Sequence, residues 1–106
     1  MDIQKVRLGR TELWVTKTAF GALPVQRVST EDAAKLLRRA YDSGINYFDT
    51  AVVYHKGDSE KVLSRALKDY DRSTYYLADK MSLGVVNSEE EVHKLFYQQL
   101  DNFHTD

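Results

Sequence analysis

Three side chains that can donate, accept or hold a proton follow two segments that the sequence predicts to be strands. Asp49 and then Tyr54 follow the run 45–48, and Lys80 closes the run 75–80. Both runs are short and rich in residues that favour strands, and each precedes a polar loop and a helical pattern. Parallel α/β proteins carry their chemistry where buried strands emerge into solvent. We therefore take this carboxylate, phenol and amine as the candidate catalytic group.

The elements that must position these side chains are predicted from periodicity. Alternation on both sides of the turn 8–12 predicts a β-hairpin over about residues 3–17. Three strand–helix units follow over about 18–43, 45–69 and 74–103. Their strands recur about every 28 residues, which is close to the interval in a (β/α)8 TIM barrel of about 250 residues. We therefore expect an α/β fold, with residues 1–106 forming a hairpin and the first three βα units of a barrel that is incomplete as given.

Each predicted helix begins at a residue that can cap it. Ser29, Asp58 and Ser88 precede the three helical patterns, and Gly44 stands where the first helix needs a left-handed residue at its end. A polar loop at 55–57 leads into the second helix. The third helix carries an apolar stripe that predicts core packing, formed by Val92, Leu95, Phe96, Leu100 and Phe103.

Composition and charge exclude several classes of protein. The chain has 106 residues, 42% of them hydrophobic and 29% charged, which is typical of one soluble globular domain. Its formal net charge of -1 provides no field to attract nucleic acid or an anionic membrane. It has no cysteine, so a thiolate metal site and a thiol nucleophile are excluded, and no stretch is apolar enough to span a membrane. We expect a cytoplasmic protein without nucleic-acid or membrane partners.

The string 44–54 reads Gly-Ile-Asn-Tyr-Phe-Asp-Thr-Ala-Val-Val-Tyr and resembles a highly specific motif of the aldo-keto reductase family. Further similarity runs through 6–11, 20–24, 57–60 and 77–81, so the resemblance covers essentially the whole chain. Segments 20–27 and 98–102 look most similar to a bacterial branch whose members often carry a C-terminal iron-sulfur module.

The resemblance implies an NADPH-dependent oxidoreductase that reduces aldehydes or ketones to alcohols, with a small-molecule carbonyl substrate and no metal within this chain. Asp49, Tyr54 and Lys80 match three members of the family's catalytic tetrad. Tyr54 would be the general acid, Lys80 its activator and Asp49 the residue that holds Lys80, because a nearby ammonium stabilises a phenolate. The residues that would lie beside the nicotinamide are Gly21, Ala22, Leu23 and Asp49.

Other interpretations of these residues remain open at this point. Asp49 alone could be a loop carboxylate bound by main-chain amides, Tyr54 could be a packing residue, and Gly21 could permit a tight turn. Asp79 stands where relatives commonly have threonine, and it could form an ion pair with Lys80. The histidines 55, 93 and 104 do not follow predicted strands, so none is favoured as the fourth member of the tetrad.

The family's histidine comes from a fourth strand, which the predicted elements do not include. We therefore expect that residues 1–106 alone do not turn over substrate. The polypeptide would be a truncated product, a fragment, or a piece that associates with other copies or with the remainder of a barrel. The alternative function is a non-enzymatic assembly or regulatory module, as in the family's potassium-channel subunits. Retention of Asp49, Tyr54 and Lys80 argues against that alternative.

Overall fold

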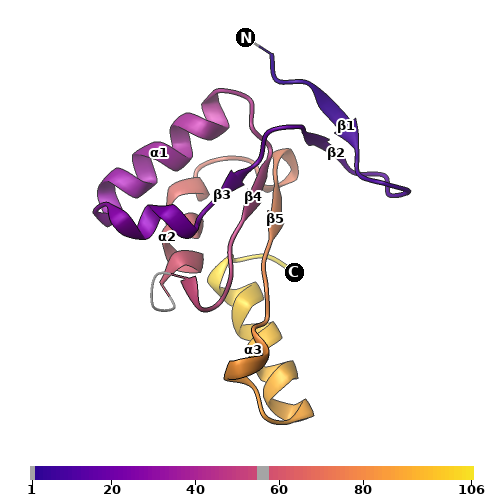
Figure 1. Cartoon of the computed structure of the whole chain (residues 1–106), viewed down its shortest axis with the longest axis vertical. Helices are drawn as coiled ribbons and strands as arrows, with labels where there is room; N and C mark the ends of the chain where they lie inside the picture. The colour runs from indigo at the N-terminus through magenta and orange to yellow at the C-terminus, as the bar shows by residue number, and fades with distance from the viewer. Residues whose placement is uncertain (1, 55–57) are drawn as a thin grey trace.

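The structure is a computed structural model that describes residues 2–54 and 58–106. A two-stranded hairpin projects from a three-stranded parallel sheet, and helices pack beside that sheet (Figure 1). The polar loop predicted at 55–57 lies outside the described residues. In chain order the elements are β1 (Lys5–Arg7), β2 (Trp14–Thr16), β3 (Phe20–Gly21), α1 (Thr30–Asp42), β4 (Tyr47–Asp49), α2 (Ser59–Leu67), β5 (Tyr76–Ala78) and α3 (Glu89–Asn102).

The hairpin forms as predicted, and the side chain of Asn46 is a main connection between it and the segment before β4. Strands β1 and β2 are antiparallel, with Val6 opposite Val15. The side-chain oxygen of Asn46 accepts a hydrogen bond from the N–H of Thr16 at 2.8 Å, and its amide group donates to the carbonyl of Trp14 at 2.9 Å. Asn46 and Thr16 are buried. The residue just before β4 therefore fixes where the hairpin sits.

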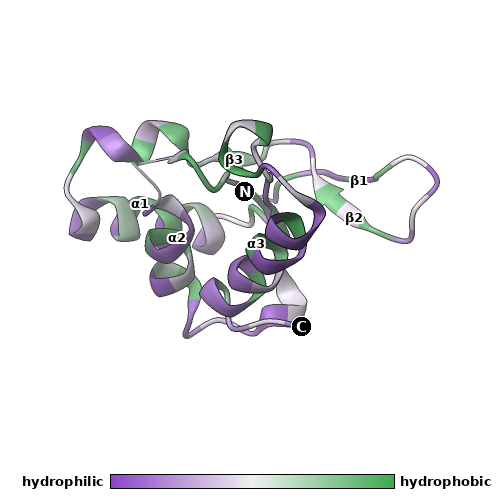
Figure 2. Ribbon diagram, turned by 90° about the horizontal axis from the view of Figure 1, so that it is seen from below, coloured by the Kyte–Doolittle hydropathy of each residue, from purple (hydrophilic) through white to green (hydrophobic). Residues whose placement is uncertain are grey.

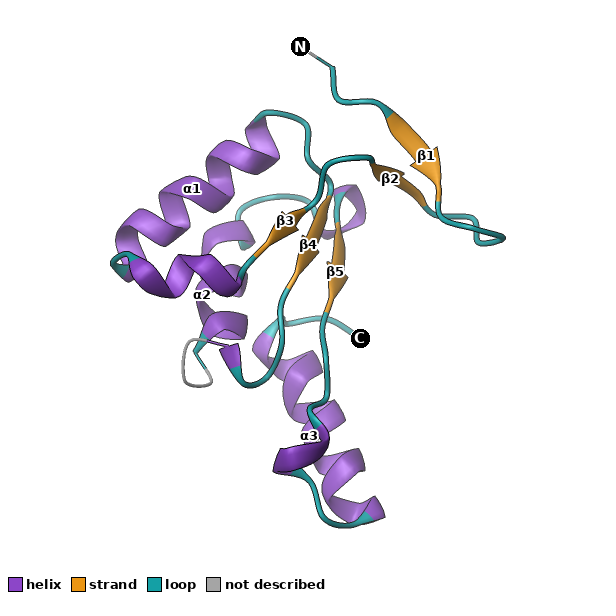
Figure 3. Cartoon of the chain, viewed as in Figure 1, coloured by secondary structure: helices purple, strands orange, loops and turns teal. Residues whose placement is uncertain are grey.

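The parallel sheet has the order β3-β4-β5 (Figure 3). Its strands are shorter than predicted at their beginnings. Ile45 donates its N–H to Ala40 of α1 and lies outside the sheet. Asn46 donates its N–H to the Thr16 hydroxyl and accepts the N–H of Tyr76 at 2.7 Å, so it adjoins β5 just before β4 begins at Tyr47. Thr74 belongs to a short 3-10 turn, Arg72–Thr74, and β5 begins only at Tyr76.

Two of the three predicted helix caps form hydrogen bonds. Ser29 accepts from the N–H of Asp32 at 3.1 Å, and Ser88 accepts from the N–H of Glu91 at 3.2 Å. The cap predicted at Asp58 is wrong, because its carboxylate makes no capping hydrogen bond. Asp58 has helical backbone angles, whereas a capping residue normally has extended ones. Gly44, with φ of +104°, follows α1 as predicted.

The core lies between α1, α2 and the parallel sheet. Its fully buried side chains include Leu37, Phe48, Leu63 and Leu67. The helices carry hydrophilic and apolar faces side by side (Figure 2), as the periodicity predicted. None of the helices in the described ranges is long and apolar enough to cross a membrane.

The prediction that the whole apolar stripe of α3 packs in a core is wrong for part of that stripe. Leu95, Leu100 and Phe103 are half-buried, whereas Val92 is 37% and Phe96 49% exposed. Only the C-terminal half of α3 lies close to α2 and β5, and its first turns extend away from them (Figure 1). Periodicity identifies an apolar face but does not determine which element covers it.

Candidate active site

The carboxyl ends of the three parallel strands meet at one edge of the sheet. The register places Gly21 beside Asp49 and Asp49 beside Ala78, and each of these residues ends its strand. Hydrogen bonds continue beyond the strands, because Thr50 donates its N–H to the Ala78 carbonyl at 2.8 Å and Val52 to the Lys80 carbonyl at 3.2 Å. This pairing brings the segment after β5 alongside the segment after β4.

The ammonium of Lys80 lies between the two other residues predicted for the catalytic group. Its Nζ donates to Oδ1 of Asp49, to the carbonyl of Thr50 at 3.0 Å and to the Tyr54 hydroxyl oxygen at 3.3 Å. Nζ also lies 5.0 Å from the centre of the Tyr54 ring. The structure thus brings Asp49, Tyr54 and Lys80 into one contact network. The carbonyl of Thr50 is a further partner that sequence analysis did not identify.

Electrostatics keep the Lys80 amine charged. Partial burial alone would lower the pKa of Lys80, but hydrogen bonds and charge interactions with Asp49 and Tyr54 outweigh it and raise this pKa above its usual value. Both members of the ion pair remain accessible, since the side chain of Lys80 is 47% and that of Asp49 36% exposed. A persistent positive charge beside a phenol oxygen stabilises negative charge on that oxygen.

The turn that carries Tyr54 is attached to α2 by two small polar residues. The hydroxyls of Thr50 and Ser59 are 2.7 Å apart and both side chains are buried. The N–H of Tyr54 donates to the Ala51 carbonyl at 3.2 Å. Sequence reasoning had assigned no role to Thr50 and Ser59. Their nine-residue separation gave no periodic signal, although a threonine directly after a strand-end carboxylate could have drawn attention to this position.

The ion pair considered between Asp79 and Lys80 does not form. The Lys80 ammonium pairs with Asp49, while Oδ1 of Asp79 accepts the main-chain N–H of Lys80 at 2.8 Å. On the other side, the side-chain amide of Gln99, on α3, donates to the Lys80 carbonyl at 3.1 Å. The main chain of Lys80 is therefore held from two directions.

The segment predicted to contact a cofactor lies beside Asp49. Ala22 is buried and donates its N–H to the carbonyl of Asp49 at 2.8 Å. Leu23 is 45% exposed, and a Cβ added at Gly21 would meet nothing within 4 Å. Gly21 has no positive φ, so its backbone does not require glycine. This face of the strand end is open beside the Asp49–Lys80 pair.

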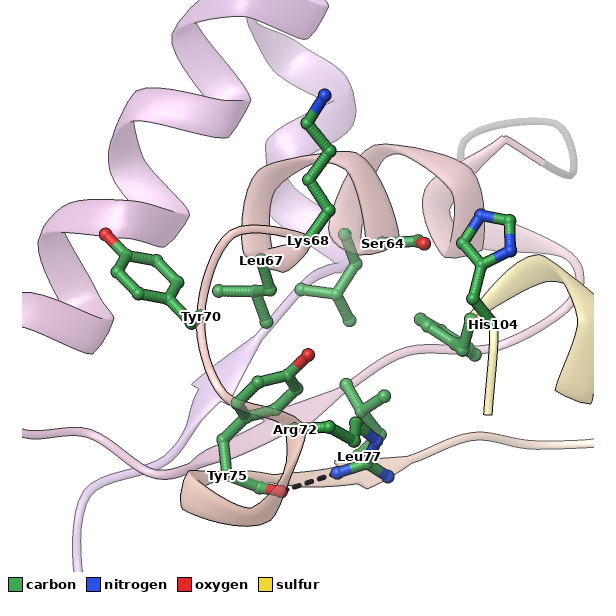
Figure 4. A pocket seen from close by; sticks show the side chains of 10 residues that line it. Ser64, Leu67, Lys68, Tyr70, Arg72, Tyr75, Leu77 and His104 are labelled. Atoms are coloured by element: carbon green, nitrogen blue, oxygen red, sulfur yellow. Dashed lines mark hydrogen bonds between the residues drawn. The ribbon is translucent and has the colours of Figure 1, made fainter. Parts of the chain in front are cut away.

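The two histidines within the described residues, His93 and His104, are not part of this network. His93 lies on the exposed side of α3, 3.8 Å from the Glu89 carboxylate, and His104 follows α3 with φ of 52°. His55 lies outside the described residues. A cavity of about 130 Å³ at the start of β5 is lined by Tyr70, Arg72 and His104 among others (Figure 4). That cavity lies beside the amino end of β5, whereas Lys80 follows its carboxyl end.

Comparison with known proteins gives consistent results. The model of the Aldo/keto reductase family matches residues 16–106. An aldo-keto reductase of Fusarium vanettenii is 40% identical over 91 residues, covering 77% of this chain and 25% of that protein. A putative voltage-gated potassium channel subunit beta of Schizosaccharomyces pombe is 37% identical over 82 residues, covering 73% of this chain and 24% of that subunit. The chain thus spans about a quarter of the length of these two relatives.

A solved structure confirms the fold. The aldo-keto reductase from Klebsiella pneumoniae in complex with NADPH has a TM-score of 0.81 and 23% identity, and the likeness covers 100% of this chain and 37% of that one. The predicted fold class is therefore correct, with a hairpin and the first three βα units of a TIM barrel. The strand-end geometry, the motif at 44–54 and the family match agree, and the chain belongs to the aldo/keto reductase family.

Proposed function

We propose that this chain supplies three catalytic residues of an NADPH-dependent oxidoreductase that reduces aldehydes or ketones to alcohols. The observation that supports this most strongly is the Lys80 ammonium held between the Asp49 carboxylate and the Tyr54 hydroxyl at the strand ends. A structural ion pair would need only Asp49 and Lys80. The additional contact with a phenol provides a proton donor beside a fixed cation, which is the arrangement that carbonyl reduction requires.

The residues at the strand ends fit a nicotinamide cofactor. The open face at Gly21 and the exposed side chain of Leu23 lie in the segment next to Asp49, so a flat ring would have room there without displacing a side chain. We propose that Gly21, Ala22, Leu23 and Asp49 line that ring. When bound, the reduced nicotinamide supplies a hydride to the carbonyl carbon. The family relative solved with NADPH supports this choice of cofactor.

Residues of this chain donate the proton and stabilise the charge that its transfer leaves behind. Negative charge develops on the substrate oxygen as its carbon–oxygen double bond becomes a single bond, and Tyr54 donates its hydroxyl proton to that oxygen. The Lys80 ammonium, at 3.3 Å, stabilises the resulting phenolate. Asp49 keeps the ammonium oriented and charged. The product is an alcohol, and Tyr54 regains its proton from solvent.

Substitution of Tyr54 tests the proposed reaction. We expect Tyr54→Phe to lower the rate of aldehyde-dependent NADPH oxidation by about 10²-fold or more, because the proton donor is lost. NADPH binding, followed by fluorescence titration, should stay nearly unchanged. Tyr97→Phe is a matched control, since Tyr97 is 62% exposed on α3.

The assay requires residues 1–106 joined to the remaining strands of a barrel, because we propose that these residues alone are inactive. An unchanged rate in Tyr54→Phe would refute the catalytic assignment. Saturable NADPH oxidation by residues 1–106 alone would refute the proposed inactivity.

The similarity to a potassium channel subunit keeps the non-enzymatic alternative as a second candidate. In that case, the barrel would serve as an assembly module and Tyr54 would have no catalytic role. Lys80→Met distinguishes the two functions. It would abolish reduction in an enzyme, but it would leave subunit assembly, measured by analytical ultracentrifugation, unaffected in an assembly module.

A further inference from the structure

A buried carboxyl group, Glu60, and a half-buried one, Asp79, face each other behind the candidate active site. Glu60 lies in the first turn of α2 and is only 1% exposed, and Asp79 directly follows β5. The two side chains are within hydrogen-bonding reach of each other. Within the described residues, Oε2 of Glu60 and Oδ2 of Asp79 are buried without a hydrogen-bond donor. Two ionised carboxylates cannot satisfy each other, because both only accept hydrogen bonds.

Among the described residues, the groups that face Glu60 do not include a compensating cation. Asp79 faces it from the end of β5, while Gln99 and Asn102 face it from α3 and are uncharged amides. The nearby Lys80 ammonium is bound to Asp49 and Tyr54 instead. In the described part of the chain, none of the groups that shift the pKa of Glu60 is a cation. A single proton is therefore the simplest donor for the two orphan oxygens.

The protonation equilibrium agrees with this geometry. Burial, followed by the hydrogen bond and negative charge of Asp79, raises the pKa of Glu60 to about 8, although the amides of Gln99 and Asn102 act in the opposite direction. Like charges held together in a buried site cannot both persist near neutral pH.

The same cluster holds the main chain of Lys80. Asp79 accepts the Lys80 N–H at 2.8 Å, and Gln99, which also contacts Glu60, donates to the Lys80 carbonyl at 3.1 Å. A change in the Glu60–Asp79 contact would therefore act on both sides of the residue whose ammonium contacts Tyr54. Loss of a shared proton would place two negative charges together and push Asp79 away from its present position.

We propose that Glu60 and Asp79 share one proton and that this pair is a positioning device for Lys80. Proton sharing stands on the structure alone, whereas the importance of Lys80 for reduction rests on the proposed function. Glu60 and Asp79 do not contact the reacting atoms in this proposal. They act through the main chain of Lys80.

Carboxyl ¹³C NMR of the labelled 106-residue chain tests proton sharing directly, with a titration from about pH 4 to about pH 9. We expect the resonance of Glu60 to titrate at least about two pH units above the ordinary carboxyl range. In Asp79→Asn the amide is a permanent donor and the like charge is removed, so the midpoint of Glu60 should fall towards that range. Glu90→Gln, at an exposed position on α3, should leave the midpoint unchanged.

The main-chain amide resonance of Lys80 tests positioning. In the unmodified chain, the chemical shift of this amide should change with pH at the same midpoint as Glu60. This pH dependence should disappear in Asp79→Asn and in Glu60→Gln, in which an amide replaces the protonated acid. A Glu60 midpoint in the ordinary range would overturn proton sharing. If the chemical shift of the Lys80 amide does not change as Glu60 titrates, the proposed positioning of Lys80 is refuted.

Kinetics then separate this proposal from the proposed function. In a protein with the complete barrel, kcat should decline as Glu60 ionises, and Asp79→Asn should remove this decline with little change in KM. A pH profile that Asp79→Asn leaves unaltered would overturn the positioning role. If the unmodified protein shows no turnover, the proposed function fails, while the NMR titrations still decide whether the proton is shared and whether the Lys80 main chain responds.

Discussion

Replacement of Asn46 by alanine should detach the hairpin from the sheet. Asn46 is buried, and its side chain connects β4 with β2 through the N–H of Thr16 and the carbonyl of Trp14. Alanine removes both contacts and leaves the backbone of β4 unchanged. The N–H of Asn46 can still donate to the Thr16 hydroxyl, at 3.3 Å in the present structure.

The structure allows the expected magnitude to be worked out for each contact. Thr16 is only 3% exposed, so its N–H would lose its acceptor without access to water, at a cost of about 1–3 kcal/mol. The carbonyl of Trp14 belongs to an exposed residue and can bind water, so the second contact contributes about 0.5 kcal/mol. We expect the free energy of unfolding to fall by about 1.5–3.5 kcal/mol, a large share of the about 5–15 kcal/mol of a typical domain.

Urea unfolding followed by fluorescence is a suitable assay, because Trp14 is the single tryptophan and lies in the hairpin itself. Circular dichroism would report the helices in the same samples. Asn87→Ala is the control, since Asn87 is exposed before α3, and we expect it to change stability by less than about 0.5 kcal/mol. If Asn46→Ala changed stability no more than this control, the anchoring role of Asn46 would be refuted.

Three further predictions concern Glu60, Lys80 and the core. Burial and the neighbouring Asp79 raise the pKa of Glu60 from its ordinary 4.5 to about 8 in the folded chain, so the folded state binds more protons between these values. Stability should therefore fall as pH rises through this window. Urea midpoints measured across the window should show this fall in the unmodified chain and little of it in Glu60→Gln; equal slopes would contradict the assignment. Lys80→Met should reduce carbonyl reduction in a protein with the complete barrel by about 10²–10⁴-fold, because the phenolate of Tyr54 loses its cation, and an unchanged kcat would exclude this role. Leu63→Ala should lower the free energy of unfolding by about 2–5 kcal/mol because Leu63 is fully buried, whereas Leu83→Ala, at a position 87% exposed, should have little effect in the same denaturation experiment.

The predicted fold was accurate where local pattern and tertiary structure favour the same arrangement. The caps at Ser29 and Ser88 form because serine hydroxyls bind N–H groups three residues away, an interaction that is local in sequence. The cap at Asp58 does not form, and the backbone of this residue is helical rather than extended. The beginning of β4 was mispredicted because the side chain of Asn46 binds a partner 30 residues away in the hairpin.

The same distinction applies to the candidate site, in which local spacing identified some residues and tertiary contacts brought in the others. The spacing of Asp49, Tyr54 and Lys80 after predicted strands was sufficient to select them. It could not reveal Glu60, whose position on the apolar side of α2 marks only a buried residue, or Gln99, which lies 19 residues beyond Lys80. A charged residue on an otherwise apolar helix face was the one available signal for Glu60.

The sequence by itself determined the order of strands and helices, the family motif at 44–54 and the residue types available at the strand ends, because these depend on neighbours within a few turns or residues. Only the tertiary structure decided that the Lys80 ammonium pairs with Asp49 rather than with Asp79, and that Asp79 lies within hydrogen-bonding reach of Glu60 instead. Parallel strand register brings residues about thirty positions apart into contact, and burial then leaves each polar atom few partners to choose from.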